Sequence, residues 1–429
     1  MKCRSFHPLT LLVLAAVAVI TPACASGNPD TVSLQYPISS PYYPVVLTGA
    51  DIPGLQGKPV GYISAYAVQQ GRLHAIPFQI DRRGKDGRFQ IALNAEQRAQ
   101  EITQPLDSND NCVFMAADAG TRLDPQQVMQ NRFVKLKLTD PDSGEHKWVY
   151  LRHGVSPASS SMDYVRYDAE HDSIESDIYR VGFSRKRPFL IDQLSWKDRH
   201  SGTWGADLVD AMKVRHTGKF LHRFGFVRTQ DDYSSELIAI KDGPVRVIRR
   251  TDNRVRIVWM LRTPSIEMDM IAYRNGFDMD TLIDVPFRIG SFFSDVETRM
   301  SLVVTPVAGQ APHRIDSPSL VDGVTLNGAM DDDEQRFNSS GDQQFVLSTH
   351  GGKLLVTLEL EPGLPIRYQV FVIDDASTSG PYGNIGFITT NWEAMDTELH
   401  RISVRTFLVR DLEPGAGLTL LNRAPRMLD

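Results

Sequence analysis

Long stretches of alternating apolar and polar residues constrain the fold of this chain more than any other feature. They lie at 253–261, 266–273, 353–360, 367–374 and 400–410. Successive side chains of a β-strand point to opposite faces, so a period of two is typical of a strand with one face against a core. Within 266–273, Met268 and Met270 share one face while Glu267 and Asp269 share the other. Because no helical segments separate these strands, we expect broad antiparallel sheets packed face to face.

The first 155 residues carry shorter strand signals. Segments rich in β-branched and aromatic residues predict strands at 60–66, 73–81, 88–91, 112–115, 133–138 and 147–151. Helices are predicted at 94–102, with Asn94 as the N-cap, and at 124–131. The small polar segment 154–161 has the composition of a linker. We therefore expect a mostly β protein, with a smaller N-terminal β domain at 26–155 and a large antiparallel β-sandwich at 156–429.

The first 25 residues have the three-part layout of a secretory signal peptide. Lys2 and Arg4 supply positive charge, residues 9–20 are almost entirely apolar, and small residues end the segment at Ala25. The apolar run is too short to cross a bilayer stably. We expect an exported protein, periplasmic or extracellular, cleaved after Ala25. Lipidation at Cys24 is the alternative, although the residues before it depart from the usual lipoprotein pattern.

Composition argues against several classes of function. The chain has 46 Lys and Arg against 52 Asp and Glu, a net charge of −6 at pH 7. Nucleic-acid binding needs a basic stripe, so nucleic acid is not an expected partner. Only Cys112 remains after cleavage, which leaves no internal disulfide and no thiolate metal cluster. The motifs of zincins, typical serine hydrolases and nucleotide-binding enzymes are absent from the sequence.

One segment has the spacing of a calcium-binding loop. Asp107, Asn109 and Asn111 stand at its first, third and fifth positions, and Asp118 stands at the twelfth. Cys112 occupies the position at which such loops need glycine for a sharp turn. The alternative is an Asx-rich turn that leads into a strand. No cofactor other than this calcium ion is expected.

An aromatic and polar segment supplies the candidate ligand surface. It contains Trp196, His200 and Trp204, with basic and hydroxyl side chains between them. Indole rings stack on the apolar face of a sugar while polar neighbours bond its hydroxyls, so this composition suits glycan binding. The alternative is that both tryptophans fix a long loop to the core.

Four residues are candidates for catalysis. His216, His222 and Tyr273 are the groups that lyase chemistry would need as base and acid, and Arg274 would hold a uronate carboxylate. The two histidines share a face only if one strand runs unbroken through Gly218. Nothing in the sequence brings Tyr273 to them.

Several runs resemble segments of exported bacterial β-proteins that have no established activity, namely those at 76–81, 107–110, 113–115 and 241–250. The long strands after residue 160 are similar in style to the large β-sandwich of galactose-mutarotase-like proteins and some polysaccharide lyases. This resemblance implies a supersandwich and an association with carbohydrate. No catalytic motif of those families can be placed on residues of this chain, and a shared fold does not establish a shared function.

The leading functional expectation is a non-catalytic protein that binds a glycan or another partner in the cell envelope. One alternative is a carbohydrate-active enzyme, such as a polysaccharide lyase or a glycoside-modifying enzyme. A further alternative is a structural or assembly protein of the envelope.

Overall fold

The structure is a computed structural model that describes residues 31–38, 42–126, 132–154, 158, 160–258, 261–306, 309–375, 383–413 and 415–425. The predicted signal peptide, with Cys24, lies outside these residues. Within the described part of the chain, no helix combines the length and the apolar character that a membrane crossing requires. The protein is mostly β and builds a sandwich of antiparallel sheets, as predicted.

Two sheets are built from strands that precede residue 154. The first has the order β1 (Thr31–Gln35), β7 (Val134–Thr139), β8 (His146–His153), β3 (Ile63–Gln69) and β4 (Arg72–Ala75). The second has the order β2 (Pro44–Thr48), β6 (Asn111–Met115) and β5 (Gln79–Asp81). Helix α1 (Ala95–Thr103) begins as predicted, because the Asn94 side chain accepts a hydrogen bond from the Gln97 amide at 2.9 Å.

Three further sheets follow. One, here the hairpin sheet, has the order β13 (Trp204–Asp207), β12 (Ile191–Lys197), β11 (Tyr179–Phe183), β10 (Ser173–Ser176) and β9 (Val165–Asp168). Another, the outer sheet, has the order β15 (Phe224–Thr229), β14 (Val209–Phe220), β21 (Phe293–Val304), β27 (Asn384–Thr390) and β26 (Arg367–Ile373).

The third and largest is the central sheet. Its order is β16 (Tyr233–Asp242), β17 (Arg246–Val258), β19 (Ile266–Tyr273), β20 (Gly276–Asp284), β28 (Leu399–Val409), β25 (Gly352–Leu360), β24 (Gln344–Thr349), β22 (Arg314–Ser317) and β23 (Leu320–Thr325). Strand β18 (Leu261–Arg262) pairs with β17. In the described part of the chain, the other α-helices are α3 (Asp332–Ser339) and α5 (Ala416–Arg423).

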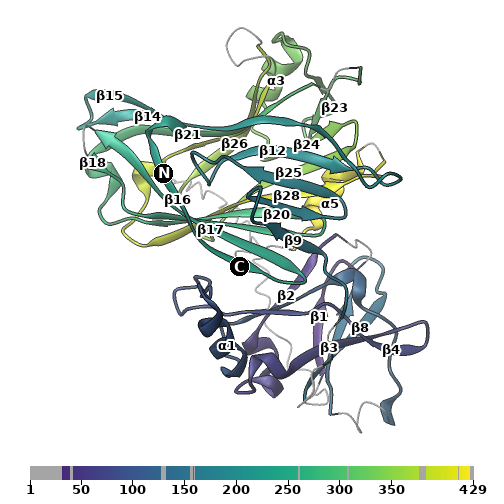
Figure 1. Ribbon diagram of the computed structural model, residues 1–429. Coiled ribbons are helices and arrows are strands. Elements are labelled where there is room, and N and C mark those ends of the chain that lie inside the picture. Colours follow the sequence, from purple (N-terminus) through teal and green to yellow (C-terminus); the bar gives the residue numbers. More distant parts are fainter. Residues whose placement is uncertain are drawn as a thin grey trace, which may run out of the picture.

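The central sheet is covered on both faces. Val404 and Leu408 of β28 belong to the core shared with the outer and hairpin sheets. Phe407 and Val409, which point the other way, belong to the core of the N-terminal strands. There the Tyr43 and Phe407 rings meet edge to face, with centroids 5.0 Å apart. In Figure 1 the purple and blue N-terminal strands accordingly lie against one side of the teal-to-yellow sandwich.

Charged residues are buried where the N-terminal strands meet the central sheet. The Arg246 side chain is 0% exposed, and its Nε donates to Asp81 at 2.7 Å while Nη1 donates to the Tyr273 hydroxyl at 3.0 Å. Arg250 makes a two-point contact with Asp269, at 2.7 and 2.8 Å. A buried charge needs such partners to offset its lost hydration. Ion pairing thus explains the acidic face of β19.

Cys112 is completely buried in β6. Burial raises the pKa of its thiol, because the thiolate would lose its hydration. We expect Ellman's reagent to leave Cys112 unmodified in the native protein lacking residues 1–25, and to modify it after unfolding in guanidinium. Rapid modification of the native protein would contradict this burial.

Candidate functional site

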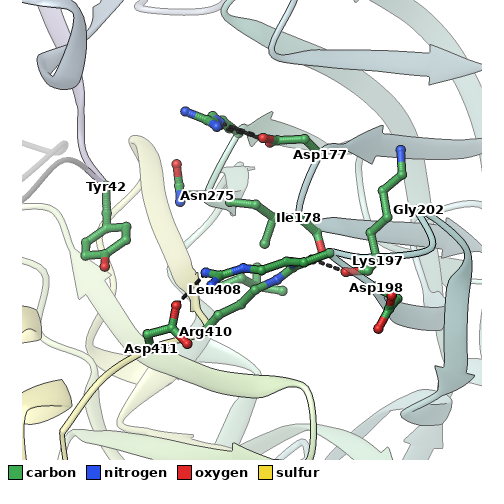
Figure 2. Close-up of a pocket in the computed structure, with 12 residues that line it drawn as sticks. Tyr42, Asp177, Ile178, Lys197, Asp198, Gly202, Asn275, Leu408, Arg410 and Asp411 are labelled. Carbon is green, nitrogen blue, oxygen red and sulfur yellow. Dashed lines mark hydrogen bonds and ion pairs between the residues drawn. The ribbon is translucent and has the colours of Figure 1, made fainter.

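An open pocket of about 420 Å³ lies beside the N-terminal segment and the hairpin sheet (Figure 2). It is lined by Tyr42, Asp177, Ile178, Lys197, Asp198, Arg199, Gly202, Arg274, Asn275, Leu408, Arg410 and Asp411. These residues come from the segment before β2, the β10–β11 turn, the β12–β13 hairpin, the β19–β20 turn and the end of β28. Turns and strand ends held on rigid sheets are common places for binding residues.

Arg410 is fixed in this pocket by neutral acceptors. Its Nη2 donates to the main-chain oxygen of Ile178 at 2.9 Å and also to that of Lys197. Its Nε is buried and has no hydrogen-bond partner. Burial and the nearby positive charge of Arg199 lower the pKa of Arg410. The guanidinium therefore retains hydrogen-bonding capacity and has a positively charged neighbour.

Two ion pairs cross the pocket. Arg274 contacts Asp177 through Nε at 2.9 Å and through Nη2 at 2.6 Å. Arg199 contacts Asp411 at 2.6 Å, with both side chains more than half exposed. Exposed pairs of this kind contribute only about 0–1 kcal/mol.

The Asp198 side chain stabilises the β12–β13 turn instead of pairing with a cation. It accepts hydrogen bonds from the main-chain amides of His200 at 3.0 Å and Ser201 at 2.7 Å. These bonds, the Ser201 amide first, lower the pKa of Asp198. Among the described residues, Lys197 and Arg410 have no acidic partner within ion-pair distance. The pocket thus has an excess of positive charge, which favours an anionic ligand.

The two tryptophans of the predicted ligand surface lie in different environments. Trp196 is 6% exposed, and its Nε1 donates to the Thr349 hydroxyl at 2.9 Å. A Cβ added at Gly351 would lie 2.3 Å from the Trp196 ring, so the ring packs directly on main chain. Trp196 is therefore a core residue, and its ring offers no surface on which a sugar could stack.

Trp204 and His200 lie nearer to solvent. Trp204 is half-buried on β13, with the Arg180 guanidinium 4.4 Å and the Lys197 ammonium 5.1 Å from its ring centroid. His200 is exposed in the β12–β13 turn. The predicted segment therefore forms a wall of the pocket, but through residues such as Lys197 rather than through the predicted aromatic rings.

His216 is partly buried between the outer and central sheets. Its Nδ1 is 2.8 Å from the Thr298 hydroxyl, and its Nε2 is 2.7 Å from the Tyr233 hydroxyl. Burial lowers the pKa of His216 to about 4, so the ring is neutral at pH 7. These contacts make it part of a neutral hydrogen-bonded chain between the outer and central sheets.

The other catalytic candidates lie elsewhere. His222 is exposed in the turn after β14, which ends at Phe220. Tyr273 bonds Arg246 at the buried contact with the N-terminal strands. His216 and Tyr273 thus have different partners on different elements, and His222 stands apart from them in an exposed turn. Arg274 alone among the four lines the pocket.

The predicted calcium ligands have partners of their own. Asn111 Oδ1 accepts from Arg83 Nε at 2.8 Å, and Asp118 Oδ1 accepts from the Tyr164 hydroxyl at 2.5 Å. Burial raises the pKa of Asp118 to about 6. In the described residues, no group of three or more His, Cys, Asp or Glu side chains is arranged to hold a metal.

The buried strand β6 lies between Asp118 and the start of the predicted calcium loop. At that start, Asp107 and Asn109 lie in an exposed turn. Asp110, absent from the predicted set, is completely buried and pairs with Arg82 at 2.6 Å. The calcium loop remains a prediction.

Fold and pocket together define an antiparallel β-sandwich protein with a charged pocket beside its N-terminal strands. No family model matches the chain, and no curated protein matches its sequence. Structural similarity is found to a protein in glycosyl hydrolase family 38 from Enterococcus faecalis, with 10% identity and a TM-score of 0.43, over 86% of this chain and 42% of that one.

Two further solved structures show weaker similarity. An alpha-N-acetylgalactosaminidase from Bifidobacterium bifidum has 16% identity and a TM-score of 0.33, over 56% of this chain and 36% of that one. Heparinase III has 8% identity and a TM-score of 0.23, over 42% of this chain and 22% of that one. This chain thus spans less than half the length of each. Similarity at this level does not establish a shared function.

Proposed function

We propose that the pocket binds an acidic saccharide unit of a glycan and that the protein acts outside the cytoplasm without cleaving its ligand. The observation that carries the proposal is that four basic side chains face three carboxylates in the pocket, and that two of the four, Lys197 and Arg410, have no acidic partner within ion-pair distance among the described residues. A location outside the cytoplasm is expected because residues 1–25 have the layout of a secretory signal peptide.

The chemistry of the lining supports a saccharide that carries a carboxylate or a sulfate. Guanidinium and ammonium groups bind such anions through charge-assisted hydrogen bonds. Asn275 and Asp177 offer a donor and acceptors to hydroxyls, and Tyr42 offers a ring beside them. In Figure 2 these side chains surround the same hollow as Arg410. A neutral apolar ligand would leave the cations without partners.

The hydrogen bonds and ion pairs of the pocket's three carboxylates support binding without catalysis. Asp177 pairs with Arg274, Asp411 pairs with Arg199, and Asp198 closes the hairpin turn. Glycosidic hydrolysis needs one carboxyl group as an acid and another as a base or nucleophile. These carboxylates already accept hydrogen bonds from other groups.

One contact favours the alternative of a carbohydrate-active enzyme. The Arg274 guanidinium carbon lies 5.2 Å from the centroid of the Tyr164 ring, and the Tyr164 hydroxyl bonds Asp118. A carboxyl group with a pKa of about 6 can exchange protons near neutral pH. Tyr164 and Asp118 would relay a proton toward a ligand held by Arg274, as a lyase-like reaction requires.

Removal of the positive charges is expected to weaken binding to acidic oligosaccharides. A hydrogen bond to a charged group contributes about 1.5–3 kcal/mol, so Lys197→Gln and Arg410→Gln should each raise Kd roughly tenfold to a hundredfold. Calorimetric titration of hits from a glycan array, run with and without calcium, measures this change. The matched control is Arg215→Gln, because Arg215 is exposed on β14 and does not line the pocket.

Lys197→Gln is the more informative variant, since the Lys197 side chain makes no hydrogen bond to any residue that the structure describes, while Arg410 bonds two main-chain oxygens. Equal binding of neutral and acidic glycans, or unchanged Kd in Lys197→Gln, would contradict the proposal. Product analysis of each bound glycan separates the alternatives. Unsaturated or shortened products would make the protein an enzyme.

A further inference from the structure

A cluster of exposed apolar side chains lies at one end of the outer sheet. It consists of Leu221, Phe224, Phe287 and Phe292, which are 50, 57, 39 and 43% exposed, and is here called the apolar tip. Nine large apolar side chains are exposed in the described part of the chain, and four of them belong to this tip. Such a concentration marks a surface that contacts something, since single exposed apolar residues are normally scattered.

The apolar tip rests on a fixed aromatic layer. The Leu221 amide donates to the Phe292 carbonyl oxygen at 2.6 Å, which joins the β14–β15 turn to the start of β21. The Phe287 and Phe292 rings meet edge to face, with centroids 5.4 Å apart. Beneath them, Phe293 contacts Phe220 and Phe226, with centroids 5.4 and 5.9 Å away. The exposed Phe287 and Phe292 rings are therefore held in place.

The turn that carries Leu221 is strained. Leu221 and His222 have φ angles of 51° and 57°, in the left-handed region that residues other than glycine rarely adopt. Non-glycine residues in this region cost free energy and persist where the surrounding structure imposes them. An exposed leucine in such a turn contributes little burial to the fold. Strain and exposure together therefore point to a contact made outside the chain.

The exposed charged side chains within three residues of a member of the apolar tip are Lys219, Arg223 and Arg288 against Asp284 and Asp295, a local excess of one positive charge. Arg223 and Arg288 are exposed, and neither has an acidic partner within ion-pair distance among the described residues. Lys219, also exposed, pairs with Asp295 at 2.8 Å. The whole chain has a net charge of −6, so this local excess runs against the average. A partner that complements it is apolar at its centre and anionic around it.

We propose that the apolar tip docks onto an anionic lipid bilayer. The phenylalanine and leucine side chains enter the boundary between headgroups and acyl chains, and Arg223 and Arg288 contact lipid phosphates. This surface is distinct from the saccharide pocket, which does not include these residues. The docked protein would remain at the bilayer surface without spanning it.

The size of the apolar tip favours a bilayer over a protein partner. An aromatic side chain buries about 150–250 Å² in full, and these are near half exposed, so the tip offers roughly 400 Å². A stable protein interface needs about 800 Å² on each partner. In Figure 1, β14 and β15 end at the periphery of the molecule, where few other elements could extend the contact. Partition into a bilayer needs no matching surface.

Vesicle flotation tests this proposal on the protein lacking residues 1–25. We expect binding to vesicles of phosphatidylcholine mixed with phosphatidylglycerol, weaker binding to phosphatidylcholine alone, and weaker binding at high salt. The double variant Phe224→Ser and Phe292→Ser should bind at least about tenfold less tightly, as should Arg223→Gln with Arg288→Gln. The matched control is Leu93→Ser, because Leu93 is 64% exposed in the N-terminal strands' region.

Absence of binding to the phosphatidylglycerol vesicles would overturn the proposal, as would unchanged binding in the phenylalanine double variant. Sedimentation velocity without lipid provides the competing outcome. A dimer that forms without lipid and disappears in the double variant would assign the apolar tip to a second copy of the chain. Unaltered thermal unfolding of each variant shows that the fold is intact.

Discussion

Replacing Arg246 with methionine is expected to lower the free energy of unfolding by about 3–5 kcal/mol. The guanidinium is completely buried and bonds Asp81, Asn111 and Tyr273. Methionine fills similar space but leaves the buried Asp81 carboxylate without its nearest cation. Lys241, 3.2 Å from Asp81 and partly exposed, offsets only part of that loss. Urea denaturation measures the change as a lower midpoint at an unchanged m-value.

Arg254→Met is the matched control on the same strand. Arg254 is 53% exposed and contacts Asp252 at 3.3 Å, so its loss should change stability by less than about 1 kcal/mol. The variant Arg246→Met with Asp81→Asn should recover part of the loss, since it removes the buried carboxylate charge. Equal effects of the Arg246 and Arg254 variants would mean that the buried contact does not anchor the N-terminal strands.

Trp196→Ala is expected to cost about 3–5 kcal/mol, because it opens a cavity and leaves the Thr349 hydroxyl without its donor. Trp204→Ala, on the adjacent strand, should cost about 1 kcal/mol, since that ring is half-buried and makes cation–π contacts. Thermal and urea unfolding of both variants measure the difference. A larger loss for Trp204 would contradict the assignment of Trp196 to the core.

The same two variants separate packing from ligand binding. We expect Trp196→Phe, which keeps most of the core filled, to bind acidic glycans as the parent does. Trp204→Ala removes the ring against which Lys197 lies and should weaken that binding. If the Trp196→Phe protein is folded but no longer binds the glycan, Trp196 would instead be part of the ligand surface.

Several of the long strands could be predicted because their signal is local, whereas β14 and β21 were not among the predicted strands. The stretch at 266–273 coincides with β19, and that at 353–360 differs from β25 by one residue. The segment 73–81 was less regular than expected, since β4 and β5 are separated at Pro77, which has no amide hydrogen to donate. The expected strand at 88–91 reduces to an isolated bridge between Arg83 and Phe89.

The site could be predicted only in part. The sequence drew attention to the hairpin segment and to Arg274, but the pocket also needs Tyr42, Asp177 and Arg410 from distant segments. No single segment carries a signal of that convergence. The burial of charged residues could not be predicted either. Arg246 lies in the alternating pattern of a strand, where a charged residue predicts an exposed side chain. Only pairing across the fold explains its burial.

The shared core also bears on how the chain folds during synthesis. Tyr43 and its apolar neighbours pack against Phe407 of β28 and Leu421 of α5, which are synthesised several hundred residues later. The Tyr43 hydroxyl even donates to a carbonyl oxygen of α5, at Leu420. Contacts so far apart in sequence form slowly, and an incomplete core exposes apolar surface in the meantime. The core around Tyr43 can therefore close only after β28 and α5 have been synthesised, and until then its apolar side chains lack their packing partners.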